Sequence, residues 1–181
     1  MSASNKPQHA KGFTLLELMV TIIIVVILGA LAIPSMTTMM LKHRVQDAAT
    51  DMFTTLFKAR SEALRRVENV KARSTNVSAD WTGGWQLIDT ASKVLDEHQP
   101  TQRMTITPTP ANLVTITYNA SGRVACAPSA CATGPKFEFT VSNGGYACTY
   151  TVSVDPTGRP YETSRRGSGT DAATGGGVPS C

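Results

Sequence analysis

A long apolar segment dominates the start of the chain. Residues 18–33 carry no charge, and all but two of them are aliphatic, Met or Ala. As a helix, residues 13–33 would be about 31 Å long at about 1.5 Å per residue, and a bilayer core is about 30 Å thick. The sequence therefore predicts one membrane-spanning helix. The segment before this helix carries positive charge, which is supplied by Lys6, His9 and Lys11. This charge should hold the N-terminal end of the helix in the cytoplasm.

A second helical pattern follows Pro34. Over residues 35–71 apolar side chains recur at spacings of three, four or seven, at Leu41, Val45, Ala49, Met52, Leu56, Ala63 and Val67, with Ala48, Phe53, Phe57 and Leu64 widening the stripe. This predicts an amphipathic helix packed on a β-sheet, with a kink at Pro34. The polar face is basic, which fits a solvated surface, a neighbouring protein, or anionic lipid headgroups near Lys42, His43 and Arg44.

The rest of the chain has the pattern of an antiparallel β-domain. Apolar runs bounded by Gly, Pro, Asn and Asp predict strands at 84–88, 103–107, 113–118, 136–141, 146–154 and 159–163. Phe137, Phe139 and Val141 alternate with polar residues, as half-buried strands require. The predicted fold class is therefore α+β, a long N-terminal helix on an antiparallel sheet. The Gly- and Ser-rich tail at 167–180 should be irregular.

Composition and cysteine placement indicate in which compartment the protein folds. Hydrophobic residues make up 41% of the chain, which excludes full disorder, and the net charge is +4. The four cysteines all fall in the last third, which favours disulfides outside the reducing cytoplasm: Cys126, Cys131, Cys148 and Cys181. Three pairings are possible. We prefer Cys126 with Cys131 and Cys148 with Cys181, because the second bond gives the terminal residue a role. A zinc site is disfavoured because its ligand spacing is absent.

No enzyme constellation is recognisable in the sequence. The glycine runs lack the Lys-Ser/Thr of a P-loop, and Gly-x-Ser-x-Gly does not occur. The three histidines are scattered, and the pair Asp96-Glu97 is expected to lie in a solvated loop. We therefore predict that the protein is not an enzyme and uses no cofactor or metal.

One ordered motif stands at the start of the apolar segment. Residues 11–17 read Lys-Gly-Phe-Thr-Leu-Leu-Glu, and with the apolar helix they resemble the type IV prepilin signature. The resemblance implies cleavage between Gly12 and Phe13 by a prepilin peptidase, N-methylation of Phe13, and assembly roles for Glu17, at mature position five, and Pro34. It also implies the type IV pilin fold, with a leader at 1–12, a membrane and filament-core helix at 13–34, an amphipathic helix at 35–73 and a globular domain at 74–181.

Glu17 is the chemically unusual residue of this motif, because a charge inside a bilayer costs several kcal/mol. After cleavage, the α-ammonium of Phe13 on a neighbouring subunit can pair with Glu17 and offset the cost of burying the carboxylate. The resemblance implies four partners: other pilins, the prepilin peptidase, the inner-membrane assembly platform and membrane lipid. It implies a single-pass inner-membrane protein with a periplasmic globular domain, which later enters an extracellular pilus.

Further motifs resemble the GspH/FimT branch of pilin-like proteins. They are Arg60-Ser61-Glu62-Ala63, Gly84-Trp85-Gln86-Leu87-Ile88, and two echoed phrases that place Gly122-Arg123 and Gly158-Arg159 after tight turns. The branch includes FimU and FimT minor pilins and the minor pseudopilins of type II secretion. It implies a minor pilin that assembles or primes a type IV pilus, with twitching, adhesion and DNA uptake as functions of the whole fibre.

Two alternative functions stay open at this point. One is a minor pseudopilin of a type II secretion system. The other is a FimT-like DNA receptor of a competence pilus, a group recognised by a Gly-Arg-x-Arg motif. Here the chain reads Gly158-Arg159-Pro160-Tyr161, so Arg165 and Arg166 would have to replace the missing second arginine. Together with Arg159 they would contact the phosphate backbone without reading sequence.

Overall fold

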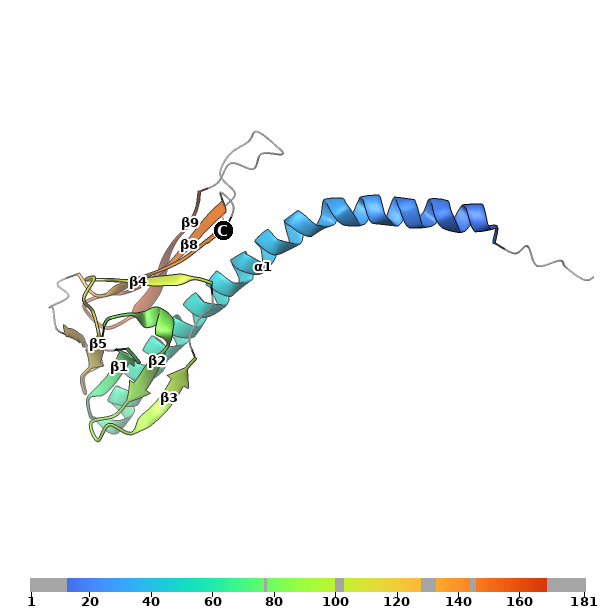
Figure 1. Cartoon of the computed structure of the whole chain (residues 1–181). Helices are drawn as coiled ribbons and strands as arrows, with labels where there is room; N and C mark the ends of the chain where they lie inside the picture. Colours follow the sequence, from blue (N-terminus) through green and yellow to red (C-terminus); the bar gives the residue numbers. More distant parts are fainter. Residues whose placement is uncertain (1–12, 77, 100–102, 128–132, 144–145, 169–181) are drawn as a thin grey trace, which may run out of the picture. The chain divides into compact units, whose positions relative to one another are not determined.

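The computed structural model describes residues 13–76, 78–99, 103–127, 133–143 and 146–168 (Figure 1). Within these ranges, the side chains at 31–35, 37–38, 143, 146 and 163–168 lie outside the description. The chain divides into two compact units, Met1–Met39 and Met40–Cys181. A single helix, α1 (Leu15–Arg66), contributes its first part to one unit and its second part to the other.

Helix α1 ends earlier than the sequence predicts. The chain leaves the helix at Val67, whose φ of 57° is left-handed. The N–H of Glu68 then donates to the carbonyl of Ala63 at 3.3 Å. This is the arrangement of a Schellman cap, in which a left-handed residue follows the last helical turn. The helix end predicted at 71–73 is therefore wrong, because Val67 stops the helix without the glycine that usually marks such a stop.

The described strands form two antiparallel sheets in the second unit (Figure 1). The five-stranded sheet has the order β3 (Val94–His98), β2 (Trp85–Ile88), β1 (Val70–Ser74), β5 (Thr115–Tyr118) and β6 (Val124–Ala127). The four-stranded sheet has the order β4 (Thr105–Thr109), β7 (Lys136–Asn143), β8 (Tyr146–Val154) and β9 (Pro160–Ser168). All pairings are antiparallel, as predicted.

The second unit has one hydrophobic core between α1 and the strands. The helix contributes small and medium apolar side chains, Val45, Ala48, Ala49, Met52, Leu56, Ala59 and Ala63. Trp81, in the 3-10 turn η1 (Trp81–Gly83), joins the layers. Its indole N–H donates to the Leu113 carbonyl at 2.7 Å, and its ring meets that of Phe137 edge-on with centroids 4.8 Å apart. The predicted packing of a helix on an antiparallel β-domain is confirmed.

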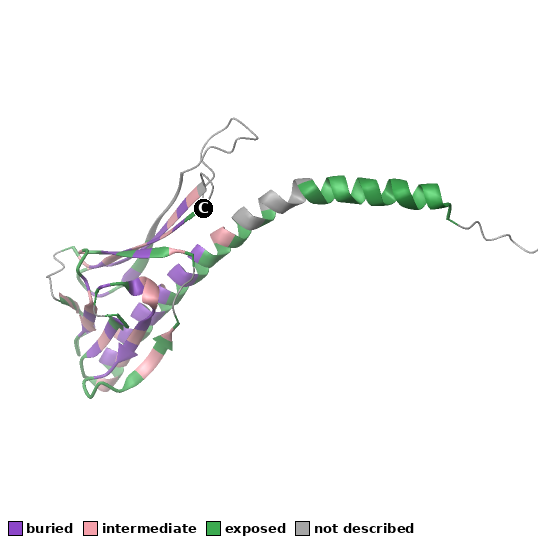
Figure 2. Ribbon diagram, viewed as in Figure 1, coloured by how far each residue is buried: buried purple, intermediate pink, exposed green. Residues whose placement is uncertain are grey.

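The apolar stripe predicted for the helix is too wide. Phe57, Leu64 and Val67 are 57%, 47% and 72% exposed, although the sequence pattern assigned them to the face that packs on the sheet. They lie to one side of the buried positions, where no described strand covers them. Figure 2 shows buried and exposed residues alternating along this part of α1. The helix therefore presents apolar side chains to its surroundings in the second unit.

The predicted strands all correspond to observed strands, and β8 has the predicted bounds. The sequence analysis missed β1, β3 and β6. Strand β3 contains Asp96 and Glu97, so the solvated loop predicted for this pair is wrong. β3 is an edge strand with no fully buried residue, and β6, the opposite edge, alternates between partly buried and exposed residues. The irregular tail predicted from residue 167 begins inside β9, and residues 169–180 lie outside the described residues.

Candidate functional site

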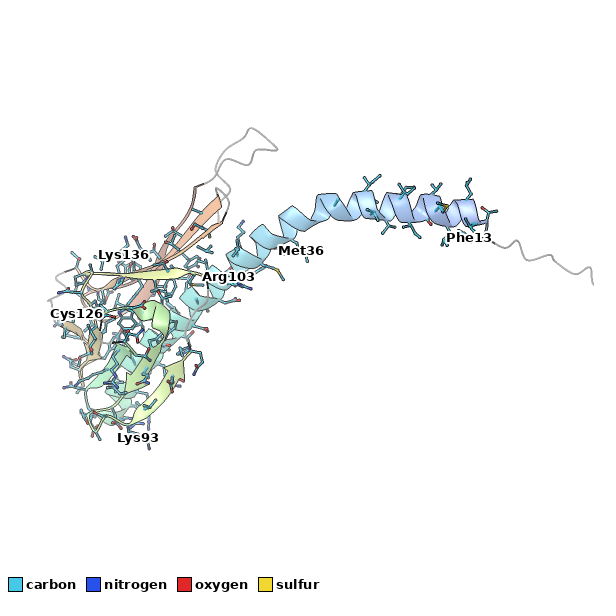
Figure 3. The ribbon with its side chains drawn as sticks, viewed as in Figure 1. Phe13, Met36, Lys93, Arg103, Cys126 and Lys136 are labelled. Carbon is cyan, nitrogen blue, oxygen red and sulfur yellow. The ribbon has the colours of Figure 1, made fainter. Side chains whose placement is uncertain are left out.

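The N-terminal end of α1 carries the residues of the prepilin-like motif. Thr14 caps the helix, because its hydroxyl accepts a hydrogen bond from the N–H of Glu17 at 3.2 Å. A Thr cap with Glu three residues later is a capping-box sequence. Phe13 precedes the cap and is 75% exposed (Figure 3). Gly12 lies outside the described residues, so the cleavage and N-methylation sites stay predictions.

Apolar side chains cover the described surface of the first unit. Those exposed by about half or more of their area are Phe13, Leu15, Leu16, Leu18, Met19, Val20, Ile22, Ile23, Ile24, Val25, Val26, Ile27, Leu28, Met36 and Met39. A continuous apolar surface of this kind marks a contact with protein or membrane. In the part of the chain that the structure describes, no helix is long and apolar enough to cross a membrane.

The kink predicted at Pro34, the membrane span predicted at 13–33 and the lipid contact predicted near Lys42 stay predictions. Helix α1 is assigned through residue 34, but the side chain of Pro34 lies outside the described residues, as does part of the span predicted at 13–33. The basic cluster after it is accessible, since Lys42 is partly exposed and His43 and Arg44 are exposed. Anionic lipid headgroups can therefore reach the side chains of this cluster.

The two echoed phrases form turns with the same hydrogen-bond scheme. In the first, the Asn119 N–H donates to the Arg123 carbonyl, and Asn119 Oδ1 accepts from the Arg123 N–H, both at 3.0 Å. In the second, Asp155 makes the same two bonds with Arg159, at 3.0 and 2.9 Å. Each Oδ1 also accepts from the hydroxyl two residues later, that of Ser121 or Thr157. The sequence echo is thus a repeated turn structure.

The two turns pack directly against each other. A Cβ at Gly158 would lie 2.0 Å from the carbonyl oxygen of Gly122, and φ is 87° and 73° at these two glycines. A Cβ at Gly122 would lie 3.2 Å from Nε of Arg60, on α1. The pair of turns therefore covers one side of the helix at Arg60. Only glycine permits the close approach of Gly158 to the neighbouring backbone.

Two buried polar atoms lie under these turns. Arg60 Nε and the Tyr118 hydroxyl make no hydrogen bond with the described residues. Burial raises the pKa of Tyr118, and the charge of Asp155 acts in the same direction while that of Arg60 opposes it. Hydrogen bonds from the Thr157 hydroxyl and the Arg159 N–H lower the pKa of Asp155. Arg60, Asp155 and Tyr118 thus form one electrostatically linked cluster with a cation, an anion and a neutral phenol.

The arginines proposed for DNA are only partly described. Arg159 is exposed at the end of its turn, and Arg123 is exposed at the equivalent position of the other turn. The side chains of Arg165 and Arg166, in β9, lie outside the described residues. Sequence reasoning did not place Arg60 and Arg123 beside Arg159. The echoed Gly-Arg phrases were the available signal, but only the packing of the turns brings them together.

A separate ion-pair cluster lies at the C-terminal end of α1. Glu62 accepts hydrogen bonds from Arg65 at 2.6 Å and Arg66 at 2.7 Å, which lower the pKa of Glu62 to about 2. Arg66 also reaches Asp89 at 3.7 Å. Asp89 is buried and accepts from the Lys93 N–H in the β2–β3 turn at 2.9 Å. This cluster ties the helix end to the five-stranded sheet and has the character of a structural contact.

Two of the four cysteines are described, and both are disulfide-bonded. Cys126 lies in β6 (Figure 3) and Cys148 is buried in β8. Cys131 and Cys181, their predicted partners, lie outside the described residues. The pairing of Cys126 with Cys131 and of Cys148 with Cys181, and the oxidising compartment inferred from the cysteines, stay predictions.

Comparison with protein families gives two matches. The family model described as the type II transport protein GspH matches residues 48–158, and the prokaryotic N-terminal methylation motif matches residues 7–33. The first match covers the second part of α1 and most of both sheets. The second covers the cleavage motif and the apolar segment. No curated protein matches the chain at a significant level.

Comparison with solved structures finds the same fold. A crystal structure of the type IV minor pilin FimU from Pseudomonas aeruginosa superposes with a TM-score of 0.54 and 20% sequence identity, over 67% of this chain and 90% of that chain. A second crystal form of that protein gives a TM-score of 0.49 at 21% identity, over 65% and 91% of the two chains. At this identity the first likeness supports the pilin fold, a long helix on an antiparallel β-domain.

Proposed function

Because the chain belongs to the GspH family and carries the N-terminal methylation motif, we propose that it is a minor pilin that helps to assemble and prime a type IV pilus. The observation that carries the proposal is the apolar, exposed first part of α1, which begins at Leu15, directly after Phe13 and Thr14, and has Glu17 in its first turn. Such a helix needs an apolar environment, which membrane lipid supplies before assembly and other pilin helices supply afterwards.

The proposed sequence of events begins with the precursor in the inner membrane. It spans the membrane once and places the globular domain in the periplasm. A prepilin peptidase cleaves between Gly12 and Phe13, and Phe13 is N-methylated. The assembly platform then moves the helix from lipid into the filament. There the Glu17 carboxylate pairs with the Phe13 ammonium of a neighbouring subunit, so that neither charge is buried alone. The globular domain becomes part of an extracellular fibre.

A second candidate is a minor pseudopilin of a type II secretion system. The match to the GspH family favours it, since that family is described as a type II transport protein. The two candidates share the cleavage, the membrane helix and the role of Glu17. The two candidates differ in the filament that the subunit joins. The phenotype of a gene deletion therefore distinguishes between them.

Direct DNA binding in a competence pilus is supported by one observation, the exposure of Arg159. Arg159 follows Asp155, whose carboxylate lies in the same turn and opposes an approaching phosphate. We therefore rank a DNA receptor below the two structural roles.

Deletion of the gene in its own host separates these candidates. We expect the loss of surface pili and of twitching, with type II secretion unchanged, because a pilus that is not primed does not extend. Complementation with the intact gene should restore pili, and complementation with Gly12→Leu should not, because a bulky residue blocks cleavage. Retained pili with lost secretion would replace the first candidate by the pseudopilin. Retained pili with a loss confined to DNA uptake would favour the receptor.

A further inference from the structure

One flank of α1 in the second unit combines apolar exposure with positive charge. Phe57, Arg60 and Leu64 follow at spacings of three and four, so they lie on one face of the helix. Phe57 is 57% and Leu64 47% exposed, and Arg60 between them is half-buried. A Cβ at Gly122 would lie 3.2 Å from both Arg60 Nε and a methyl of Leu64, so the paired turns border this face directly.

Arg60 places a cation at the centre of this face. Its Nε is buried against the first turn and makes no hydrogen bond with the described residues. The side chain as a whole is only half-buried, so an acceptor oxygen can approach the exposed part of Arg60 from outside. A carboxylate is well matched to guanidinium, because a charge-assisted bond is about twice as strong as a neutral one.

The charges around Arg60 favour an anionic group of limited size. Arg123 and Arg159 are exposed at the ends of the two turns, next to the glycines that pack together. Asp155 is the acid of the second turn, and its charge influences the same cluster. Three arginine cations and one carboxylate therefore lie around this face. Their net positive charge attracts an anionic group, whereas the charge of Asp155 repels the extended negative charge of a polyanion.

We infer that Phe57, Arg60 and Leu64 with Arg123 and Arg159, here called the contact surface, dock a neighbouring subunit of the same filament through a carboxylate seated on Arg60. This inference rests on the proposed function as a filament subunit. A protein partner fits better than a nucleic acid, because exposed apolar side chains flank Arg60 and a phosphate backbone offers them nothing to pack on. Arg and aromatic residues are also enriched at the energetic centre of protein interfaces.

Site-specific photo-cross-linking in the host tests the contact surface. The full-length protein would carry a benzophenone amino acid in place of Leu64. A matched control would carry it at Lys93, which is exposed in the β2–β3 turn and is not a residue of the contact surface (Figure 3). We expect cross-links from position 64, and not from 93, to a pilin-like subunit in sheared filaments. Peptide mapping should find an Asp or Glu of that subunit beside the cross-linked residue.

Charge variants then test the carboxylate. Arg60→Glu should lower the yield of the cross-link from position 64 by about tenfold or more, as expected for loss of an interface anchor. Arg73→Glu makes the same charge change on the face of β1 that points away from the core and should have little effect. Phe57→Ala removes an exposed side chain that does not support the core, so a fall in yield there reports on contact and not on folding.

Three outcomes would overturn the inference. If the protein reaches filaments but position 64 cross-links only lipid or nothing, the proposed function stands and the contact surface does not. If position 64 cross-links to DNA, the surface belongs to a receptor. If the protein never reaches filaments, the proposed function fails and this inference fails with it.

Discussion

Replacing Glu17 with alanine is expected to leave membrane insertion intact and to reduce incorporation into filaments by at least about tenfold. Removal of a charge from an apolar segment lowers the cost of insertion. Removal of one partner of a buried ion pair leaves the other charge uncompensated, which costs about 3–5 kcal/mol, and about 1.4 kcal/mol already corresponds to a tenfold change in an equilibrium. Quantitative immunoblots of membranes and of sheared filaments measure the two effects separately.

Two further variants distinguish the charge of Glu17 from its position in the capping box. Glu17→Gln keeps a side chain suited to the box but has no charge, so it should fail as Glu17→Ala does. Thr14→Ala removes the hydroxyl that accepts the Glu17 N–H, which costs about 1 kcal/mol of helix stability, but it keeps the carboxylate and should assemble. Efficient assembly of Glu17→Gln together with poor assembly of Thr14→Ala would assign Glu17 to helix capping alone.

Gly158→Ala is expected to destabilise the globular domain strongly. The residue has a φ of 87°, and a Cβ there would lie 2.0 Å from the carbonyl oxygen of Gly122. The left-handed conformation costs alanine about 1–2 kcal/mol, and backbone shifts to relieve overpacking add about 1–3 kcal/mol. Since domains have about 5–15 kcal/mol of stability in total, urea unfolding of the full chain in detergent should show a clearly lower midpoint.

Gly122→Ala provides the matched comparison. Its φ of 73° imposes a similar conformational cost, but the atoms that a Cβ would meet, at 3.2–3.3 Å, are ends of the Arg60 and Leu64 side chains, which can move. We therefore expect a smaller loss of stability than in Gly158→Ala. Equal losses in the two variants would mean that the backbone contact between the turns contributes little, and that only the glycine conformation matters.

The fold was predictable where the sequence signal is local and strong. Phe137 and Phe139 in β7 alternate with polar residues because one face of that strand packs in the core. Tyr150 and Val152 in β8 alternate with polar residues in the same way, although Thr151 and Ser153 are also buried. Strand β1 could not be separated from the helix before it, since Val67 ends α1 in a conformation that valine rarely adopts. Edge strands β3 and β6 bury too little apolar surface to leave an alternating pattern.

The two candidate sites also differ in how far the sequence could predict them. The motif around Phe13 and Glu17 is contiguous, so its order alone identified it. The contact surface combines a helix with two turns that are far apart in the chain, and Gly122 and Gly158 meet only in the folded domain. The exposure of Phe57 and Leu64 also depends on which side of α1 the strands cover. Helical spacing could not decide that, because a stripe three or four residues apart looks the same whether or not a partner covers it.

Mass spectrometry of the protein recovered from sheared filaments tests the proposed role as a filament subunit most directly. We expect a chain that lacks residues 1–12 and begins at an N-methylated Phe13, present in the filament fraction at a lower level than the principal pilin. A chain that begins at Met1, or a protein that is abundant in membranes and absent from filaments, would contradict the proposal.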